Sequence, residues 1–391
     1  YRRLGTIALL GLAAAGLVAG WWAFWRAPVL LARSDNARRS IAERWVPRGA
    51  ILARSGEALA ESVGEPGELE RWYSHPALGP IIGYTNPIYG QSGLESSLDG
   101  YLRGLQGYPS LTIWQNHLLY GMPPPGLDVR LSLDLPLQQA ADAALQGRVG
   151  GLVLLNAQSG EILAMATSPT FDANTLEEDW QSLVADAGAP LYNRPADGLY
   201  PPGAALAPFL LAQAAQSGAI PDLPGSLAYT LDGERLWCAL PPSGHNWGAA
   251  IRSGCPASAA KLAQGTGEDG LLALLEALGL FSTPQLRLPA QSGTQPETTG
   301  EAAKLLLGQV EPDSGSALTV SPLQMALAAA VLSNQGTRPS PLLVMAVDTP
   351  QAGWVVLPWL EEPVEVFTPK AARSAAQQLA DAQLPLWQTT A

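Results

Sequence analysis

The fold of this chain is decided around the stretch Tyr200-Pro201-Pro202-Gly203-Ala204-Ala205-Leu206-Ala207-Pro208. A Pro-Pro-Gly turn precedes a run of strong helix formers, so we expect a buried helix to begin near Gly203. A turn that enters a helix in this way has the form of a nucleophile-bearing segment. The positions that could hold a nucleophile and its base are alanines, however. Whether the chain is an enzyme therefore depends on a few side chains.

Composition limits the classes of protein that need to be considered. The 391 residues are enough for more than one domain and a sizeable core. The net charge of -12 argues against broad binding to nucleic acid, because the phosphate backbone of nucleic acid binds basic protein surfaces. Residues 265–270 fit the Gly-x-Gly-x-x-Gly pattern, but they follow a helix-like stretch and include two acidic residues, so we expect a turn between helices. His75, His117 and His245 lack metal-ligand spacing, and no metal or cofactor is predicted.

The N-terminal region contains an uncharged segment from Leu4 to Trp25. A helix of that length would span about 30 Å of hydrocarbon, and three tryptophans at its end are typical of an aromatic belt. We therefore predict a retained membrane anchor over residues 1–27, rather than a cleaved signal peptide. The rest of the chain is expected to be extracytoplasmic, on a single-pass protein of the cell membrane.

The two cysteines, Cys238 and Cys255, are compatible with that compartment. They could close a loop worth about 3 kcal/mol in the chain-entropy model. They could equally be two small buried hydrophobic side chains. The sequence leaves both alternatives open.

Periodicity predicts the following elements before Tyr200. Alternating apolar residues around a Ser-Gly turn over 48–60 indicate a hairpin. A helix is expected from Ser92, with Ser92 as its N-cap and Glu95 completing a capping box. The predicted elements that follow are an edge strand over 129–133, a helix opened by Asp134 that runs to Leu145, and a strand pair over 151–155 and 161–166 at the centre of a sheet.

After Tyr200 the chain is expected to be mostly helical. The predicted helices cover 204–216, 249–264, 268–279, 300–307 and 321–335. Five tryptophans could mark a partner surface, although buried core positions are expected for most of them: Trp237, Trp247, Trp354, Trp359 and Trp387.

Several short motifs occur in an order that resembles the class B penicillin-binding proteins, the bitopic transpeptidases of peptidoglycan synthesis. They include Arg48-Gly49-x-Ile51, Gly90-x-Ser92-Gly93-Leu94-Glu95, Leu131-Ser132-Leu133-Asp134, Ser159-Gly160-Glu161-Ile162-Leu163-Ala164-Met165 and Leu318-Thr319-Val320-Ser321-Pro322-Leu323-Gln324-Met325-Ala326. The resemblance runs from the predicted anchor almost to the C-terminus. It implies an α+β fold in three parts: the transmembrane helix over 1–27, a small β-rich pedestal (dimerisation-like) domain over 28–127, and a transpeptidase-like domain over 128–391 with an antiparallel sheet flanked by helices.

The family's chemistry requires Ser-x-x-Lys, in which the lysine takes the proton of the serine hydroxyl. The matching positions here are Ala204 and Ala207. The second family motif, Ser-x-Asn, is matched at Gly254-Cys255-Pro256, where Gly254 and Pro256 replace the serine and asparagine. The third, Lys-Thr/Ser-Gly, has no match, so part of the sheet is either lost or lies past Ala391.

The resemblance and these replacements together predict a catalytically inactive homologue, and so not an enzyme. The expected role is scaffold or activator of a polytopic glycosyltransferase of the shape, elongation, division and sporulation (SEDS) family. The resemblance implies contact with that partner through Leu4 to Trp25 and the pedestal. Two alternatives stay open: an acyl-transferase or hydrolase with a non-standard nucleophile such as Ser253, and a receptor for glycan or peptide.

Overall fold

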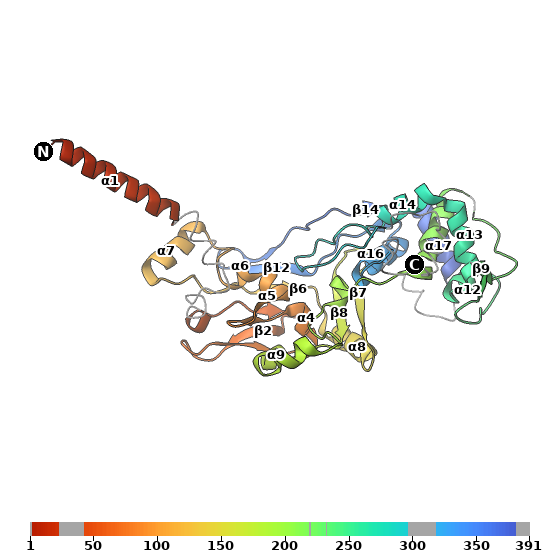
Figure 1. The fold of residues 1–391 in the computed structure, drawn as a ribbon, viewed down its shortest axis with the longest axis horizontal. Coiled ribbons are helices and arrows are strands. Elements are labelled where there is room, and N and C mark those ends of the chain that lie inside the picture. Colours follow the sequence, from red (N-terminus) through yellow and green to blue (C-terminus); the bar gives the residue numbers. More distant parts are fainter. Residues whose placement is uncertain (1, 23–42, 219, 232, 296–317, 381–391) are drawn as a thin grey trace.

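The protein is described here by a computed structural model that covers residues 2–22, 43–218, 220–231, 233–295 and 318–380. It begins with helix α1 (Arg2–Trp21), which projects from one end of an elongated molecule (Figure 1). Within these ranges, no helix combines the length and apolar character needed to cross a membrane. The predicted transmembrane helix, Leu4 to Trp25, is thus not found among the described residues, and its last part falls outside them.

A six-stranded mixed sheet lies at the centre of one half of the molecule. Its strands lie in the order β13-β12-β6-β1-β2-β3. Their bounds are β1 (Ile51–Leu52), β2 (Ala58–Val63), β3 (Glu70–Tyr73), β6 (Val129–Leu131), β12 (Val344–Thr349) and β13 (Gly353–Val356). The predicted hairpin over 48–60 is confirmed by the antiparallel pair β1–β2, in which Gly56 turns the chain at φ +91°. The sheet thereby joins strands from two distant parts of the sequence.

Strand β6 is an interior strand, so the predicted edge position is wrong. It pairs in parallel with β1 on one side and antiparallel with β12 on the other. Val129 and Leu131 are fully buried. The alternation of residues 129–133 could not reveal this position, because the strand that covers the second side lies more than two hundred residues further along the chain.

Short helices and a two-stranded hairpin complete the pedestal. They are η2 (Pro76–Leu78), α4 (Gly79–Ile82), β4 (Thr85–Asn86), β5 (Gly90–Gln91), α5 (Gly93–Ser97), α6 (Asp99–Leu102) and α7 (Ser110–Tyr120). Ser92 occupies the N-cap position of α5, but its side chain makes no cap hydrogen bond. The predicted capping box is wrong, because the Glu95 carboxylate is engaged by two arginines instead.

The strand pair β7 (Gly150–Leu155) and β8 (Ile162–Ser168) forms the predicted antiparallel hairpin. Among the described residues these two strands make a sheet of their own, so the expected central place in a larger sheet is wrong. Strand β7 is mostly half-buried, whereas β8 is buried. Helices α8 (Leu135–Leu145) and α10 (Arg194–Asp197) contact the hairpin, while η3 (Ala173–Thr175) and α9 (Leu176–Ala185) follow β8 and η3 contacts β3. Helix α8 begins as predicted, since Asp134 accepts a hydrogen bond from the Leu137 N–H at 3.3 Å.

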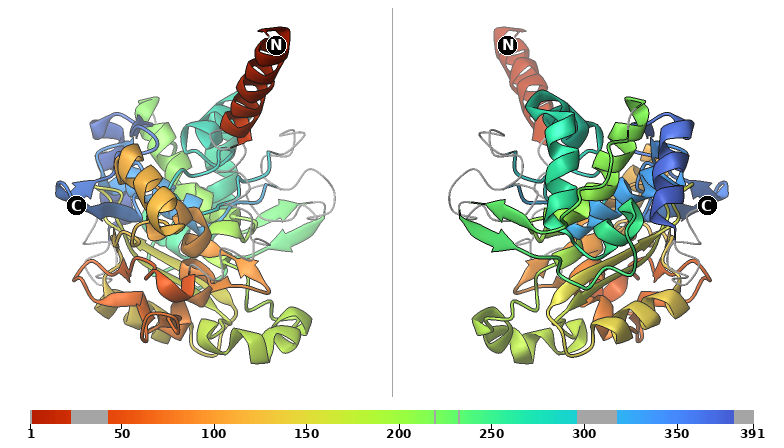
Figure 2. Two further views of the ribbon diagram at one scale, coloured as in Figure 1. Left: turned by 90° about the vertical axis from the view of Figure 1, so that its left-hand side faces the viewer. Right: turned by 90° about the vertical axis from the view of Figure 1, so that its right-hand side faces the viewer.

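The other half of the molecule is mainly helical (Figures 1 and 2). Its elements are η4 (Gly203–Leu206), α11 (Ala207–Gln216), β9 (Tyr229–Leu231), β10 (Glu234–Leu236), α12 (Trp247–Arg252), α13 (Pro256–Thr266), α14 (Glu268–Ala277), α16 (Pro322–Ser333), β11 (Thr337–Arg338), β14 (Val364–Glu365) and α17 (Pro369–Leu379). The predicted turn between helices at 265–270 is confirmed at Gly267. The predicted helix over 300–307 lies outside the described residues.

Two separate hydrophobic cores correspond to the two halves. One lies under the six-stranded sheet, and the other lies between α11, α13, α14, α16 and α17. The expectation that most of the five tryptophans are buried is wrong. Trp247 is only 5% exposed, but Trp237 and Trp359 are 67% and 61% exposed, and Trp354 is 37% exposed. Trp387 lies outside the described residues.

Candidate functional site

The stretch around Ala204 forms a short bridge followed by a tight helical turn. Tyr200 and Val320 exchange both backbone hydrogen bonds at 2.9 Å, which fixes the entry to the turn. Residues Gly203–Leu206 then form the 3-10 helix η4, and α11 follows without a break. Ala204 is half-buried, whereas Ala207 is 2% exposed and belongs to the core. The predicted α-helix therefore begins at Ala207 and not at Ala204.

Residues three apart in a 3-10 helix lie on the same side of it, so Ala204 and Ala207 share one side of the turn. Methyl groups occupy both positions. A methyl group cannot attack a carbonyl carbon, and it cannot accept or donate a proton. The chemistry of an acyl ester at this turn would need a side chain from elsewhere.

The second predicted motif lies at the corner between α12 and α13. Gly254 takes φ +60°, and Pro256 begins α13, so the two residues shape the corner. The buried side chain of Ser253 is just before it, at the C-cap of α12. Helix α13 contacts both η4 and α11. The tertiary structure thus brings the two motif regions, which are fifty residues apart in sequence, into one part of the helical half.

Cys238 and Cys255 are joined by a disulfide, with an S–S distance of 2.08 Å. The bond connects the segment after the β9–β10 hairpin to the corner between α12 and α13. A backbone hydrogen bond of 3.1 Å from Leu240 N–H to Ser253 O adds a second connection at the same place. The loop that carries Cys238 is therefore held against the second motif region.

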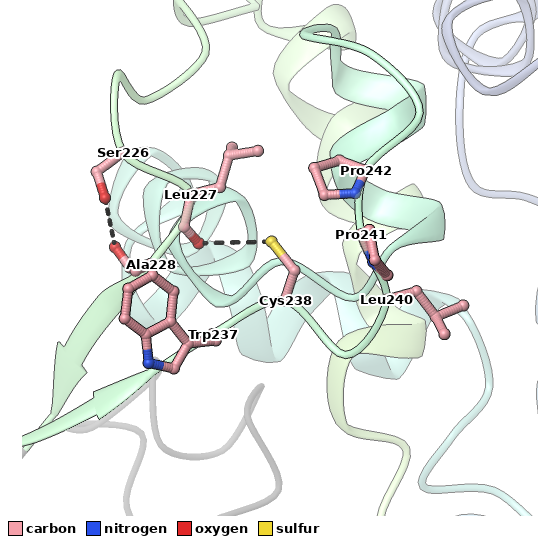
Figure 3. Close-up of a pocket in the computed structure, with 8 residues that line it drawn as sticks. All are labelled: Ser226, Leu227, Ala228, Trp237, Cys238, Leu240, Pro241 and Pro242. Atoms are coloured by element: carbon pink, nitrogen blue, oxygen red, sulfur yellow. Dashed lines mark hydrogen bonds between the residues drawn. The ribbon is translucent and has the colours of Figure 1, made fainter.

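A pocket of about 380 Å³ opens beside this disulfide (Figure 3). Its lining is mostly apolar and consists of Ser226, Leu227, Ala228, Trp237, Cys238, Leu240, Pro241 and Pro242. The guanidinium of Arg235 lies over the exposed Trp237 ring, 4.5 Å from its centroid. The pocket can accept an apolar or aromatic group, and the arginine adds a positive charge at Trp237.

A buried ionic cluster lies in the pedestal and was missed by the sequence analysis. The Glu95 carboxylate, which has no exposed surface, accepts from Arg48 Nε at 2.6 Å and from Arg71 Nε at 2.7 Å. Arg48 also donates to Asp99 Oδ1 at 2.7 Å and to the Glu95 backbone oxygen at 2.7 Å. The arginine and the glutamate were both present in the quoted family motifs, but nothing local in the sequence shows that they pair.

Electrostatics keep this cluster ionised. Burial works to raise the pKa of the Glu95 carboxyl, but the positive charges of Arg71 and Arg48 outweigh it and lower that pKa. Burial likewise works to lower the pKa of Arg48, and the charges of Glu95 and Asp99 outweigh it and raise that pKa. The cluster therefore fixes β3, α5, α6 and the segment before β1 relative to one another.

Metal ligation is not indicated for the residues that can be described. Among them, no group of three or more His, Cys, Asp or Glu side chains could hold a metal ion. Of the three histidines in the chain, His75 has its Nδ1 2.8 Å from Ser74 Oγ. The pKa of His117 is lowered by burial and by the charge of Arg103.

Comparison with known protein families gives a match for the pedestal and a match for the C-terminal part of the chain. Residues 150–385 match the family described as the penicillin binding protein transpeptidase domain, and these residues make up more than half of the sequence. The chain belongs to the penicillin-binding protein transpeptidase family. Residues 48–129 match the penicillin binding protein A dimerisation domain. The family resemblance predicted from the sequence motifs is thereby confirmed.

Named relatives of this penicillin-binding protein family member are enzymes of peptidoglycan synthesis. Peptidoglycan D,D-transpeptidase PbpA of Mycolicibacterium smegmatis is 29% identical over 386 residues, which cover 90% of this chain and 76% of the relative. Peptidoglycan D,D-transpeptidase MrdA of Acinetobacter baumannii is 29% identical over 332 residues, which cover 71% of this chain and 48% of the relative.

Solved structures agree with the fold. The imipenem acyl-enzyme complex of penicillin-binding protein A from M. tuberculosis has a TM-score of 0.73 and 25% identity, and the match covers 88% of this chain and 85% of that one. The ceftriaxone acyl-enzyme complex of the same protein has a TM-score of 0.73 and 26% identity, with 87% and 80% covered. A transpeptidase-like α+β fold with a dimerisation domain is therefore shown.

These relatives overturn one prediction, namely that the chain is not an enzyme. They are named as D,D-transpeptidases, and the similar structures include acyl-enzyme complexes, which points to an enzyme. The prediction rested on the side chains at two family motifs, Ser-x-x-Lys and Ser-x-Asn, and on the missing third motif. The residues at the motif positions show whether the usual nucleophile and base are present. Their replacement does not exclude a reaction in which another side chain takes part.

Proposed function

We propose that this penicillin-binding protein homologue acts in peptidoglycan synthesis as scaffold or activator of a polytopic SEDS-family glycosyltransferase. The pedestal is the observation that supports the proposal most directly. Its match to a dimerisation domain covers residues 48–129, and the buried cluster of Arg48, Arg71 and Glu95 holds its elements in one arrangement. A surface that is ordered before binding loses less conformational entropy when a partner docks.

The proposal includes a place in the cell. The bulk of the chain is extracytoplasmic, and Leu4 to Trp25 serve as a single-pass membrane anchor that contacts the glycosyltransferase together with the pedestal. The disulfide between Cys238 and Cys255 supports this location, because such bonds persist in oxidising compartments outside the cytoplasm.

Site-specific photocrosslinking in membranes tests the scaffold role. A photoreactive amino acid replaces Trp72, whose side chain is 50% exposed on the edge strand β3 of the pedestal. The matched control carries it at Val149, which is 74% exposed between α8 and β7. We expect a covalent adduct with a multi-span glycosyltransferase at position 72 and not at position 149. Recovery of the full-length protein alone at both positions, after extraction in mild detergent, would refute the scaffold role.

The second candidate function is acyl transfer, to which the names of the relatives point. In such a reaction a hydroxyl oxygen forms an ester with the acyl carbon, the amide C–N bond breaks, and the leaving amine takes a proton. Ser253 provides the candidate hydroxyl, because it adjoins the second motif region. Its backbone oxygen accepts a hydrogen bond from the N–H of Leu240, a residue that lines the pocket. Its side chain is buried, so substrate access would require movement of the segment Leu240–Pro242.

Labelling with a fluorescent β-lactam tests this second function. An acyl-transfer enzyme forms a stable covalent adduct that is visible on a denaturing gel. If Ser253 is the nucleophile, labelling of the wild-type chain is lost in Ser253→Ala and kept in Ser258→Ala, a buried serine on α13 whose hydroxyl donates to Cys255 O at 2.6 Å. Labelling that survives in both variants excludes Ser253 as the nucleophile. Absence of labelling in the wild type excludes acyl transfer to this class of substrate.

A further inference from the structure

Helix α7 (Ser110–Tyr120) has its apolar residues on the outside. None of its residues is buried. Five large side chains are between 50% and 69% exposed: Leu111, Trp114, Leu118, Leu119 and Tyr120. Leu111, Trp114 and Leu118 are spaced i, i+3 and i+7, so they form a continuous stripe along the helix. We call these three side chains the outer stripe.

Three polar residues of α7 lie on its inner side together with the half-buried Ile113, whereas Ser110 and Gln115 are exposed. Thr112, Asn116 and His117 are half-buried, and Asn116 Nδ2 donates to Thr112 O at 2.9 Å. Burial and the charge of Arg103 lower the pKa of His117, which favours its neutral imidazole. A helix on the surface of a globular domain normally buries its apolar face and exposes its polar face. Helix α7 instead exposes five of its six large apolar or aromatic side chains, which predicts an apolar environment on its outer side.

The lack of charge around α7 helps to identify the apolar environment on its outer side. No charged residue occurs from Gly104 to Leu127, in a chain whose net charge is -12. An acidic protein is repelled by anionic lipid surfaces, and a segment without acidic residues avoids this electrostatic cost. Trp114 and Tyr120 have the amphipathic rings that are enriched at membrane–water interfaces.

The position of α7 in the molecule agrees with this environment. It lies at the same end as α1, whose side chains Ile7, Leu9 and Leu10 are each 68% exposed (Figures 1 and 2). Two exposed apolar helices therefore occur together at one end of an elongated protein. Eleven residues of helix are only about 16 Å long, well short of the hydrocarbon thickness, so α7 could lie in a bilayer surface but could not cross it.

We propose that α7 is an interfacial membrane helix, which inserts Leu111, Trp114 and Leu118 into the surface of a lipid bilayer. Insertion is driven by apolar area, since the helix has no lysine or arginine with which to attract anionic headgroups. The pedestal thereby gains a second contact with the membrane, at the end where α1 lies. This inference does not depend on the partner or the reaction proposed above.

Fluorescence of the full-length protein on vesicles tests the proposal. Leu118→Cys carries an environment-sensitive nitrobenzoxadiazole probe, and the disulfide-bonded Cys238 and Cys255 do not react with it. Vesicles consist of phosphatidylcholine, with or without phosphatidylglycerol, and contain a trace of doxyl-labelled lipid. We expect a blue shift and at least twofold quenching at position 118. The matched control, a probe at Val149→Cys, should show neither effect, although Val149 is 74% exposed.

Two further readouts separate lipid from other partners of the outer stripe. Leu111→Gln should at least halve the quenching at position 118 without changing the thermal midpoint, because Leu111 is 62% exposed in the fold. Raising the salt from 50 to 500 mM should change the quenching less than twofold, since no charge takes part.

Three outcomes would overturn the proposal. The first is an unquenched probe at position 118. The second is a blue shift that depends on protein concentration in the absence of lipid, which would assign the outer stripe to a second copy of the chain. The third is quenching that requires phosphatidylglycerol and disappears at high salt, which would assign the contact to charged residues elsewhere.

Discussion

The buried cluster of the pedestal allows a quantitative prediction for Glu95→Gln. The substitution keeps the size of the side chain but removes the charge that pairs with Arg48 and Arg71. Arg48 retains the carboxylate of Asp99 at 2.7 Å, whereas the bonds that Arg71 retains go to neutral oxygens, such as Gly49 O at 2.9 Å. The Arg71 side chain is only 7% exposed, so its guanidinium cannot regain full hydration. Removing one partner of a buried ion pair costs about 3–5 kcal/mol.

Urea unfolding of the full-length chain at pH 7, followed by circular dichroism, measures the effect. The matched control is Glu161→Gln, which breaks the pair with Arg54 at 2.9 Å. Because the Arg54 side chain is 40% exposed, that pair should contribute only about 0–1 kcal/mol. Glu95→Gln should therefore lower the free energy of unfolding by several kcal/mol more than Glu161→Gln. Equal losses in the two variants would show that the reasoning is wrong.

The pH dependence gives an independent check of the same cluster. The pKa of Glu95 is lowered in the folded protein from its ordinary value of 4.5, because Arg71 and Arg48 outweigh the effect of burial. A lowered carboxyl pKa adds stability that is fully present above the unfolded value and is lost as the pH falls through the folded value. The difference in unfolding free energy between wild type and Glu95→Gln should therefore be constant from pH 7 to 5. It should shrink below pH 4.5, where the unfolded chain takes up a proton on Glu95 before the folded protein does, and vanish once the pH has fallen through the folded pKa.

Two further predictions concern other parts of the fold. Replacing both Cys238 and Cys255 by serine should lower the unfolding free energy by about 3 kcal/mol, because the bond closes a loop across a sequence separation of 17; urea unfolding without reductant measures this, and an unchanged midpoint would show that the bond contributes nothing. Gly160→Ala should be more destabilising than Gly56→Ala in the same assay. Both glycines have positive φ, +74° and +91°, but a Cβ at Gly160 would lie 1.8 Å from Ser340 O, whereas one at Gly56 would meet no atom within 4 Å. Gly56→Ala should cost about 1–2 kcal/mol for the backbone conformation alone, and similar losses at the two sites would contradict the predicted clash.

Local elements were predictable where neighbouring residues specify them. Ser55 and Gly56 mark the turn of the β1–β2 hairpin, and Asp134 with Pro136 marks the start of α8. In each case the signal and the structure lie within a few residues of each other, so backbone conformation and local hydrogen bonds decide the outcome. The interior position of β6 was not predictable in this way, since the covering strand β12 is distant in sequence.

For the candidate site, the sequence likewise shows which residues stand at the motif positions, whereas folding decides which of them come together. The sequence by itself determined that Ala204, Ala207, Gly254 and Pro256 stand where the family motifs carry reactive side chains, because identity and register are properties of the chain. Which side chains meet depends on folding. Glu95 reaches Arg48 across 47 residues, and the disulfide holds Leu240 and its pocket against the second motif region.

Exposure also belongs to the tertiary structure. The sequence of α7 shows a largely apolar helix without acidic or basic (Lys or Arg) residues, but it does not show which side of the helix faces the pedestal. Packing decided that Thr112, Asn116 and His117 are half-buried and that the outer stripe faces away from the protein. The physical reason is that burial is a property of three-dimensional neighbours, whereas hydropathy is a property of each residue alone.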